Sequence, residues 1–156
     1  MYLTVHAVAG ALIGHYVNEP IISFVVGFIS HFFLDMLPHY DTHLPKDRSA
    51  KEIRKQYFNK IFSVIYIDIS LTLITAVALF TNNIYFLTQA VFWGMVGAIL
   101  PDILQLLSFI FKNNWVLKQC NGLHNLVHYS PESQISIFLG HVTQLITLII
   151  LIRPLV

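Results

Sequence analysis

The sequence has few charges. Of its 156 residues only 11% are Asp, Glu, Lys or Arg, whereas an average soluble domain has about 25%. Hydrophobic residues make up 56%, which is too many for a disordered polar chain. These proportions argue against a typical soluble globular protein and predict a polytopic membrane protein.

Cysteine is also scarce. Cys120 is the only one, which excludes an intrachain disulfide and every metal motif built on paired cysteines. Any metal site must therefore use the histidines and carboxylates. The formal net charge is only +1, so the chain has no overall basic field that would attract nucleic acid. We expect membrane lipids, and no nucleic acid, as partners.

Uncharged stretches divide the chain into five apolar segments. A membrane-spanning helix needs about 20 mostly apolar residues, and Asn82 and Asn83 interrupt the long uncharged run 69–101 with a turn. The predicted helices cover approximately residues 3–17, 20–37, 58–80, 85–111 and 133–152. The first is short enough to be either a thin span or a partly inserted helix. The sequence thus predicts an all-α, polytopic membrane bundle of about five helices, forming one domain over residues 1–156.

The cations predict the orientation. Six of the nine Lys and Arg residues lie between positions 46 and 60, so the positive-inside rule makes the predicted loop 38–57 cytoplasmic. With five alternating helices the N-terminus is then cytoplasmic as well. No Lys or Arg precedes the first apolar run, unlike in a secretory signal peptide. We read that run as part of the mature fold and expect a multi-pass protein of the prokaryotic inner (cytoplasmic) membrane.

Ionisable side chains in the apolar segments are informative, because burying a charge in hydrocarbon is costly. His31 and Asp35 are four residues apart, as are His124 and His128, so each pair shares one helix face if its stretch is helical. The alternating topology brings the candidate metal ligands to one membrane face: His6, His31, Asp35, Asp102, His124 and His128.

Imidazole and carboxylate ligands suit Zn, Mn or Fe, of which we expect Zn first. A divalent ion lowers the pKa of a bound water towards about 7, so hydrolysis is the natural chemistry. Asp68 lies about 15 Å into its predicted helix, near mid-membrane. Asp41 follows the proline turn at Pro38. We interpret Asp41 and Asp68 as candidate catalytic carboxylates that orient or deprotonate the water.

Several short motifs carry a family resemblance. Residues 27–41 read GFISHFFLDMLPHYD, residues 100–102 read LPD, residues 124–130 read HNLVHYS, and His6 is followed by Gly10. Together they resemble the YdjM-type inner-membrane metal-dependent hydrolases, a group remotely similar to zinc-dependent phospholipase C. The resemblance implies a small all-helical membrane protein with His and Asp metal ligands and a hydrolase activity. The order of the motifs differs from that group, and the second aspartate that usually follows LPD is missing.

Three functions are compatible with this pattern. The leading hypothesis is a membrane-bound, metal-dependent hydrolase of a phosphoester or lipid head group at the cytoplasmic membrane face. The second is a proton or divalent-cation transporter that uses Asp68, Asp102 and His141. Its weakness is that the polar residues crowd one side of the predicted bundle. The third is a non-catalytic membrane protein whose metal site only staples helices together and is closed to water.

Overall fold

The structure is a computed structural model that describes residues 1–39, 50–82, 88–110, 119, 122 and 136–155. Within these ranges the regular elements are all helical, which confirms the predicted all-α fold. The elements are α1 (Leu3–Val17), α2 (Pro20–Asp35), α3 (Ala50–Asn82), α4 (Gln89–Ile110), α6 (Ile137–Ile152) and the short 3-10 helix η2 (Arg153–Leu155).

A tight turn joins α1 to α2. Asn18 caps α1 with a positive φ of 55°, a left-handed conformation that asparagine tolerates better than most residues. Pro20 then takes the first position of α2, where a missing N–H costs nothing because that group has no partner inside the helix. The chain therefore reverses at Asn18 and Glu19, as the sequence predicts.

The other boundaries also have local causes. α3 begins at Ala50 rather than at the predicted residue 58, because residues 50–57 (AKEIRKQY) are mostly strong helix formers despite their charge. α2 ends at Asp35, shortly before Pro38, which disfavours helical backbone in the residue preceding it. α4 starts after Thr88, whose hydroxyl accepts a hydrogen bond of 3.2 Å from the N–H of Val91.

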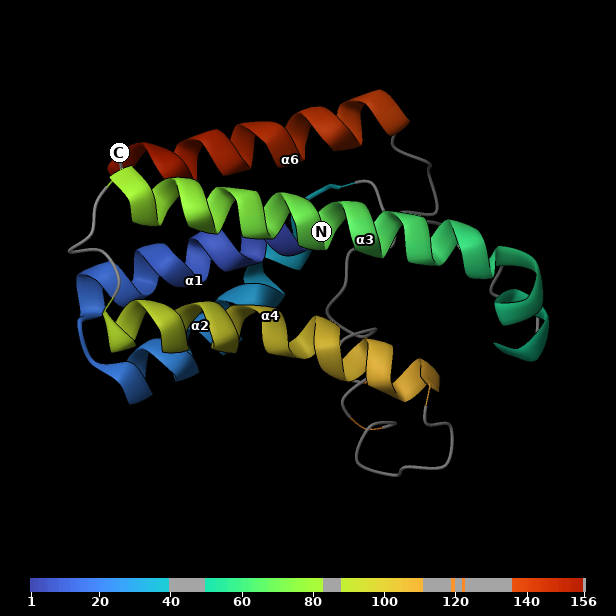
Figure 1. The fold of residues 1–156 in the computed structure, drawn as a ribbon, viewed down its shortest axis with the longest axis horizontal. Helices are drawn as coiled ribbons and strands as arrows, with labels where there is room; N and C mark the ends of the chain where they lie inside the picture. Colours follow the sequence, from blue (N-terminus) through green and yellow to red (C-terminus); the bar gives the residue numbers. More distant parts are fainter. Residues whose placement is uncertain (40–49, 83–87, 111–118, 120–121, 123–135, 156) are drawn as a thin grey trace.

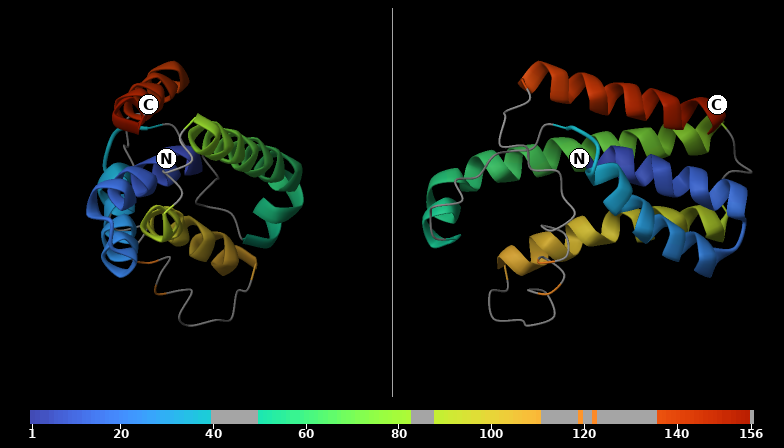
Figure 2. Two further views of the ribbon diagram at one scale, coloured as in Figure 1. Left: turned by 60° about the vertical axis from the view of Figure 1, so that its left-hand side comes forward. Right: turned by 180° about the vertical axis from the view of Figure 1, so that it is seen from behind.

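The five α-helices run along a common long axis and alternate in direction (Figure 1). The α1–α2 turn, the end of α3, the start of α4 and the C-terminus lie at the same end of the bundle. Seen more nearly along the helices, α1 lies inside a group formed by α2, α3, α4 and α6 (Figure 2). Segments far apart in sequence therefore meet around α1.

α1 is the central helix of the bundle. It contacts α2, α3, α4 and α6, and nine of its 15 residues are buried. A helix of 15 residues is only about 22 Å long, shorter than the hydrocarbon layer of about 30 Å. Because other helices cover α1, it does not need the length that a lipid-exposed span requires.

The outer surface is apolar. Three segments are long and apolar enough to cross a membrane: Phe62–Leu79, Gln89–Leu107 and Phe138–Leu155. Large hydrophobic side chains project outward, such as Ile21 (80% exposed), Phe138 (77%) and Phe33 (68%). Soluble proteins rarely leave so much contiguous apolar surface uncovered. The protein is therefore a membrane protein whose outward side chains suit lipid.

Five glycines, here called the glycine seam, lie where α1, α2 and α4 meet: Gly10, Gly14, Gly27, Gly94 and Gly97. A Cβ added to any of them would lie closer than 3.0 Å to a backbone atom of a neighbouring helix, which real Cβ atoms essentially never do. Gly10 and Gly27 both approach the carbonyl of Gly94. The three backbones can come this close only because no side chain stands between them.

The glycine seam predicts a severe effect for Gly94→Ala. The added methyl group would meet the carbonyl of Gly10, a backbone atom that can move only if α1 and α4 separate. We expect a loss in the free energy of unfolding of about 1–3 kcal/mol or more. Unfolding in detergent followed by circular dichroism measures this loss.

Gly122→Ala is the matched control, because the described structure has no atom within 4 Å of a Cβ added there. It should leave stability unchanged or slightly higher, since alanine favours helix over glycine. Equal effects of the two substitutions would contradict the role of the glycine seam.

Candidate metal centre

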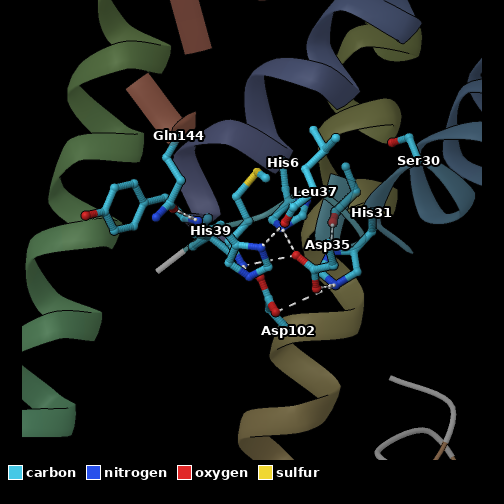
Figure 3. A network of polar contacts seen from close by, with 12 residues as sticks. His6, Ser30, His31, Asp35, Leu37, His39, Asp102 and Gln144 are labelled. Carbon is cyan, nitrogen blue, oxygen red and sulfur yellow. Dashed lines mark hydrogen bonds and ion pairs between the residues drawn. The ribbon is translucent and has the colours of Figure 1, made fainter. Parts of the chain in front are cut away.

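His6 of α1, His31 of α2 and Asp102 of α4 converge on one point, where their side chains face one another (Figure 3). One possible ligand atom from each residue lies within 4.8 Å of those of the other two. Both histidines are fully buried, and their rings stack with centroids 4.1 Å apart. The side chain of Asp102 remains 25% exposed. Two imidazoles and a carboxylate form a donor set that suits a divalent metal.

The glycine seam brings these side chains together. His6 lies one helical turn before Gly10, and His31 one turn after Gly27, so each histidine shares a face with a seam glycine. Asp102 follows Gly97 by five residues in α4. Because the three backbones are in contact at the glycines, the two histidines one turn away lie close together, and Asp102 meets them from further along α4.

Asp35 links the two histidines. Its Oδ1 lies 3.1 Å from Nε2 of His6, and its Oδ2 lies 3.2 Å from Nε2 of His31. Its Oδ1 also accepts a hydrogen bond of 3.0 Å from the Met1 ammonium group. The residue is only 1% exposed. A buried carboxylate with these partners fixes the orientation of both rings.

The second nitrogen of His31 identifies its tautomer. Nδ1 lies 2.9 Å from the carbonyl oxygen of Ala98, and because a carbonyl can only accept, Nδ1 carries the hydrogen. A carbonyl oxygen has two lone pairs, so that of Ala98 can accept this bond beside any bond within α4. In neutral His31, the Nε2 lone pair therefore points toward Asp35 and toward Asp102 Oδ1, which lies 3.7 Å away.

One ring nitrogen of His6, called its bare nitrogen below, is Nδ1, which is buried and has no hydrogen-bond partner among the described residues. Leaving a buried polar atom unpartnered is costly, so such an atom usually meets a water or an ion. The lone pair of His31 and the bare nitrogen of His6 together fit the binding of a cation.

A second polar network surrounds the start of α1. Asp68 of α3 accepts hydrogen bonds from the N–H of Leu3 (2.7 Å, to Oδ2) and the N–H of Thr4 (3.3 Å, to Oδ1). Gln144 of α6, fully buried, accepts a bond of 2.8 Å from the N–H of Tyr2. Gln144 is not among the site residues predicted from the sequence. The signal that could have identified it is an amide in a largely apolar helix, where a polar side chain usually bonds to another helix.

Two further histidines, His39 and His141, also have partners in the structure, and three predicted site residues remain to be placed. His39, also at this end of the bundle, accepts from the Met1 ammonium group at Nε2 (2.9 Å) and donates from Nδ1 to the carbonyl of Leu37 (2.7 Å). His141 is hydrogen-bonded to the Tyr2 hydroxyl. Three predicted site residues lie outside the described residues: Asp41, His124 and His128.

Comparison of the chain with protein-family models, with curated proteins and with solved structures found no match. The resemblance to the YdjM-type hydrolases rests on the residues of the motifs alone. Of these motif residues, His6, His31, Asp35 and Asp102 lie together in the structure.

The network predicts that Asp35→Ala destabilises the protein. The substitution removes the acceptor for His6 and the Met1 ammonium group, and leaves these buried groups without their partner. We expect a loss of about 2–4 kcal/mol in the free energy of unfolding. Asp35→Asn should cost less, because its amide oxygen still accepts one bond.

Ser30→Ala, in the same helix, is the control. The Ser30 hydroxyl donates only to the carbonyl of Gly27 in its own helix (2.7 Å), so its loss should be nearly neutral. Chemical denaturation in detergent compares the variants. An Asp35→Ala protein as stable as Ser30→Ala would show that Asp35 does not hold the two rings.

Proposed function

We propose that this protein is a membrane-bound, metal-dependent hydrolase that holds a divalent ion, with Zn as first choice, at His6, His31 and Asp102. The convergence of three ligand atoms within 4.8 Å is the observation that carries the proposal. The motifs shared with the YdjM-type hydrolases support the same reading.

The charges of the site favour a cation. The protonated Nδ1 of His31 turns the Nε2 lone pair of the neutral ring toward the oxygens of Asp35 and Asp102. A lone pair that faces two carboxylates is unfavourable unless a proton or a metal ion lies between them. The proton would be carried by His31 or by one of the two carboxyl groups. The bare Nδ1 of His6 favours the ion, because a proton on His31 leaves this nitrogen without a partner.

The depth of the site favours a lipid head group as substrate. The α1–α2 turn and the start of α4 lie at one end of the bundle. Counted from there along each helix at 1.5 Å per residue, His6, Asp35 and Asp102 lie about 17–22 Å away. In a hydrocarbon layer of about 30 Å, they are nearer the opposite membrane surface. By the positive-inside rule we assign that surface to the cytoplasmic side of an inner membrane. Asp102, the partly exposed member, is the residue that a head group would meet.

The proposed reaction is hydrolysis of a phosphoester, in which water attacks phosphorus and the bond to the leaving oxygen breaks. A bound divalent ion supplies Lewis acidity and an activated water at neutral pH. The protein's own residues hold the ligands in place: Asp35 orients both rings, and the carbonyl of Ala98 fixes the His31 tautomer. Asp41 stays a predicted carboxylate for orienting the water.

Metal content tests the binding step. Mass spectrometry of purified protein should find bound metal in the wild type and a loss of metal in both His31→Ala and Asp102→Ala. His15→Ala is the control, because His15 lies at the other end of α1 and is exposed. No metal in the wild type after reconstitution would remove the hydrolase mechanism and leave the buried carboxylates as structural or transport groups.

Hydrolysis is tested separately. The metal-loaded protein is offered bis(p-nitrophenyl) phosphate and vesicles of phosphatidylglycerol with phosphatidylethanolamine. Activity should disappear with a chelator and in His31→Ala, and should persist in His15→Ala. Activity on the vesicles would assign a lipid, whereas activity on the soluble ester alone would assign a small phosphoester. Bound metal without hydrolysis of either would assign a structural metal site.

A further inference from the structure

Asp68 is a carboxylate inside a membrane-length apolar segment, Phe62–Leu79. Such a group needs partners, and the structure places it at the start of another helix. The first N–H groups of any helix lack partners within the helix. The side chain of Tyr2, the N-cap residue of α1, accepts no hydrogen bond from these groups. Asp68 of α3, 65 residues from Leu3 in the sequence, accepts one from the N–H of Leu3.

The contact is extensive for one side chain. Besides the two backbone N–H groups, the hydroxyl of Thr4 donates to Asp68 Oδ1 (3.0 Å). That hydroxyl is also 3.0 Å from the hydroxyl of Thr72, one turn further along α3. A negative charge at a helix N-terminus is favoured by the helix dipole. Hydrogen bonds in such a low-dielectric interior are stronger than in water. Both effects explain how α3 tolerates a carboxylate there.

His6 lies three residues after Leu3, on the first turns of α1. Whatever fixes the backbone of Leu3 and Thr4 also fixes the direction of the His6 side chain. We propose that Asp68 is a positioning residue: by capping α1, it holds His6 at the junction with His31 and Asp102. The effect on metal affinity rests on the proposed function, whereas the placement of His6 does not.

This role differs from the catalytic role that the sequence suggested for Asp68. Both carboxylate oxygens already accept hydrogen bonds from α1. Taking a proton from water would remove the negative charge of Asp68 and weaken the hydrogen bonds that it accepts from α1. A positioning residue has to keep them. Removing the Asp68 side chain therefore displaces His6 if Asp68 is a positioning residue. It changes only the reaction rate if Asp68 is a general base.

The first test is chemical protection of His6 in the full-length protein in detergent. Diethyl pyrocarbonate modifies accessible imidazoles, and mass spectrometry reports His6 and His31 separately. In the wild type both rings are fully buried and should react slowly. In Asp68→Ala, His6 should react much faster while His31 stays protected. Asp68→Asn should be intermediate, because its amide oxygen still accepts from Leu3.

Ser70→Ala is the matched control. Ser70 lies two residues from Asp68, and its hydroxyl donates to the carbonyl of Tyr66 in its own helix (2.8 Å). Both rings should stay protected in it. Equal protection of His6 in Asp68→Ala and Ser70→Ala overturns the proposal. If Asp68→Ala exposes both histidines, Asp68→Asn decides: faster reaction at His6 alone supports the proposal, and unchanged protection overturns it.

The second test is Co²⁺ binding, followed by the visible absorption of the bound ion. Asp68 does not bond to His6 itself, but misplacing a ligand should weaken metal binding as much as losing the ligand's own partner does, so we expect an increase in Kd of about 10–100-fold for Asp68→Ala. An unchanged Kd and spectrum, with hydrolysis abolished, would instead assign Asp68 to catalysis. The two proposals fail separately: exposure of His6 in a protein that binds no Co²⁺ supports positioning and removes the hydrolase.

Discussion

Backbone contact between α1, α2 and α4 at the glycine seam is the constraint on which the structure depends. Lipid provides no hydrophobic force between membrane helices, so their association relies on close packing and on hydrogen bonds. The five glycines supply the packing, since a Cβ at any of them would collide with a neighbouring backbone. Side chains one turn from the seam, such as His6 and His31, therefore lie in contact with each other. The candidate metal centre is a consequence of how the helices pack.

The polar side chains obey a second rule, which is that buried polar groups in apolar surroundings need partners. Asp35, Asp68 and Gln144 each bond to a residue of another helix. Their contacts gather where α1 begins, so the polar groups form a layer at one level of the bundle. The same layer ties α3 and α6 to the three helices of the seam. The polar residues that make this layer a candidate site therefore also hold the helices together.

Much of this arrangement could be predicted from the sequence. Uncharged runs indicated the helices, the gap between the first two predicted helices placed a turn at Asn18 and Glu19, and spacing put His31 and Asp35 on one face. The partner of Asp68 could not be predicted. Its bonds to α1 join residues 65 positions apart and depend on the rotation of two helices, which the sequence of a helix with apolar side chains on every face does not encode. The start of α3 was predicted eight residues too late, because the charged residues 50–57 were assigned to a loop although they favour helix.

The burial of α1 also bears on how the protein assembles. Helices α3, α4 and α6 contain apolar stretches long enough to enter a bilayer individually, whereas α1 is short and most of its residues are buried against other helices. A short, mostly buried helix of this kind is stabilised little by lipid and mainly by packing against neighbouring helices. We expect the long helices to insert first and α1 to dock against them afterwards. Since His6 belongs to α1, the three candidate ligands converge only once α1 has packed against α2 and α4.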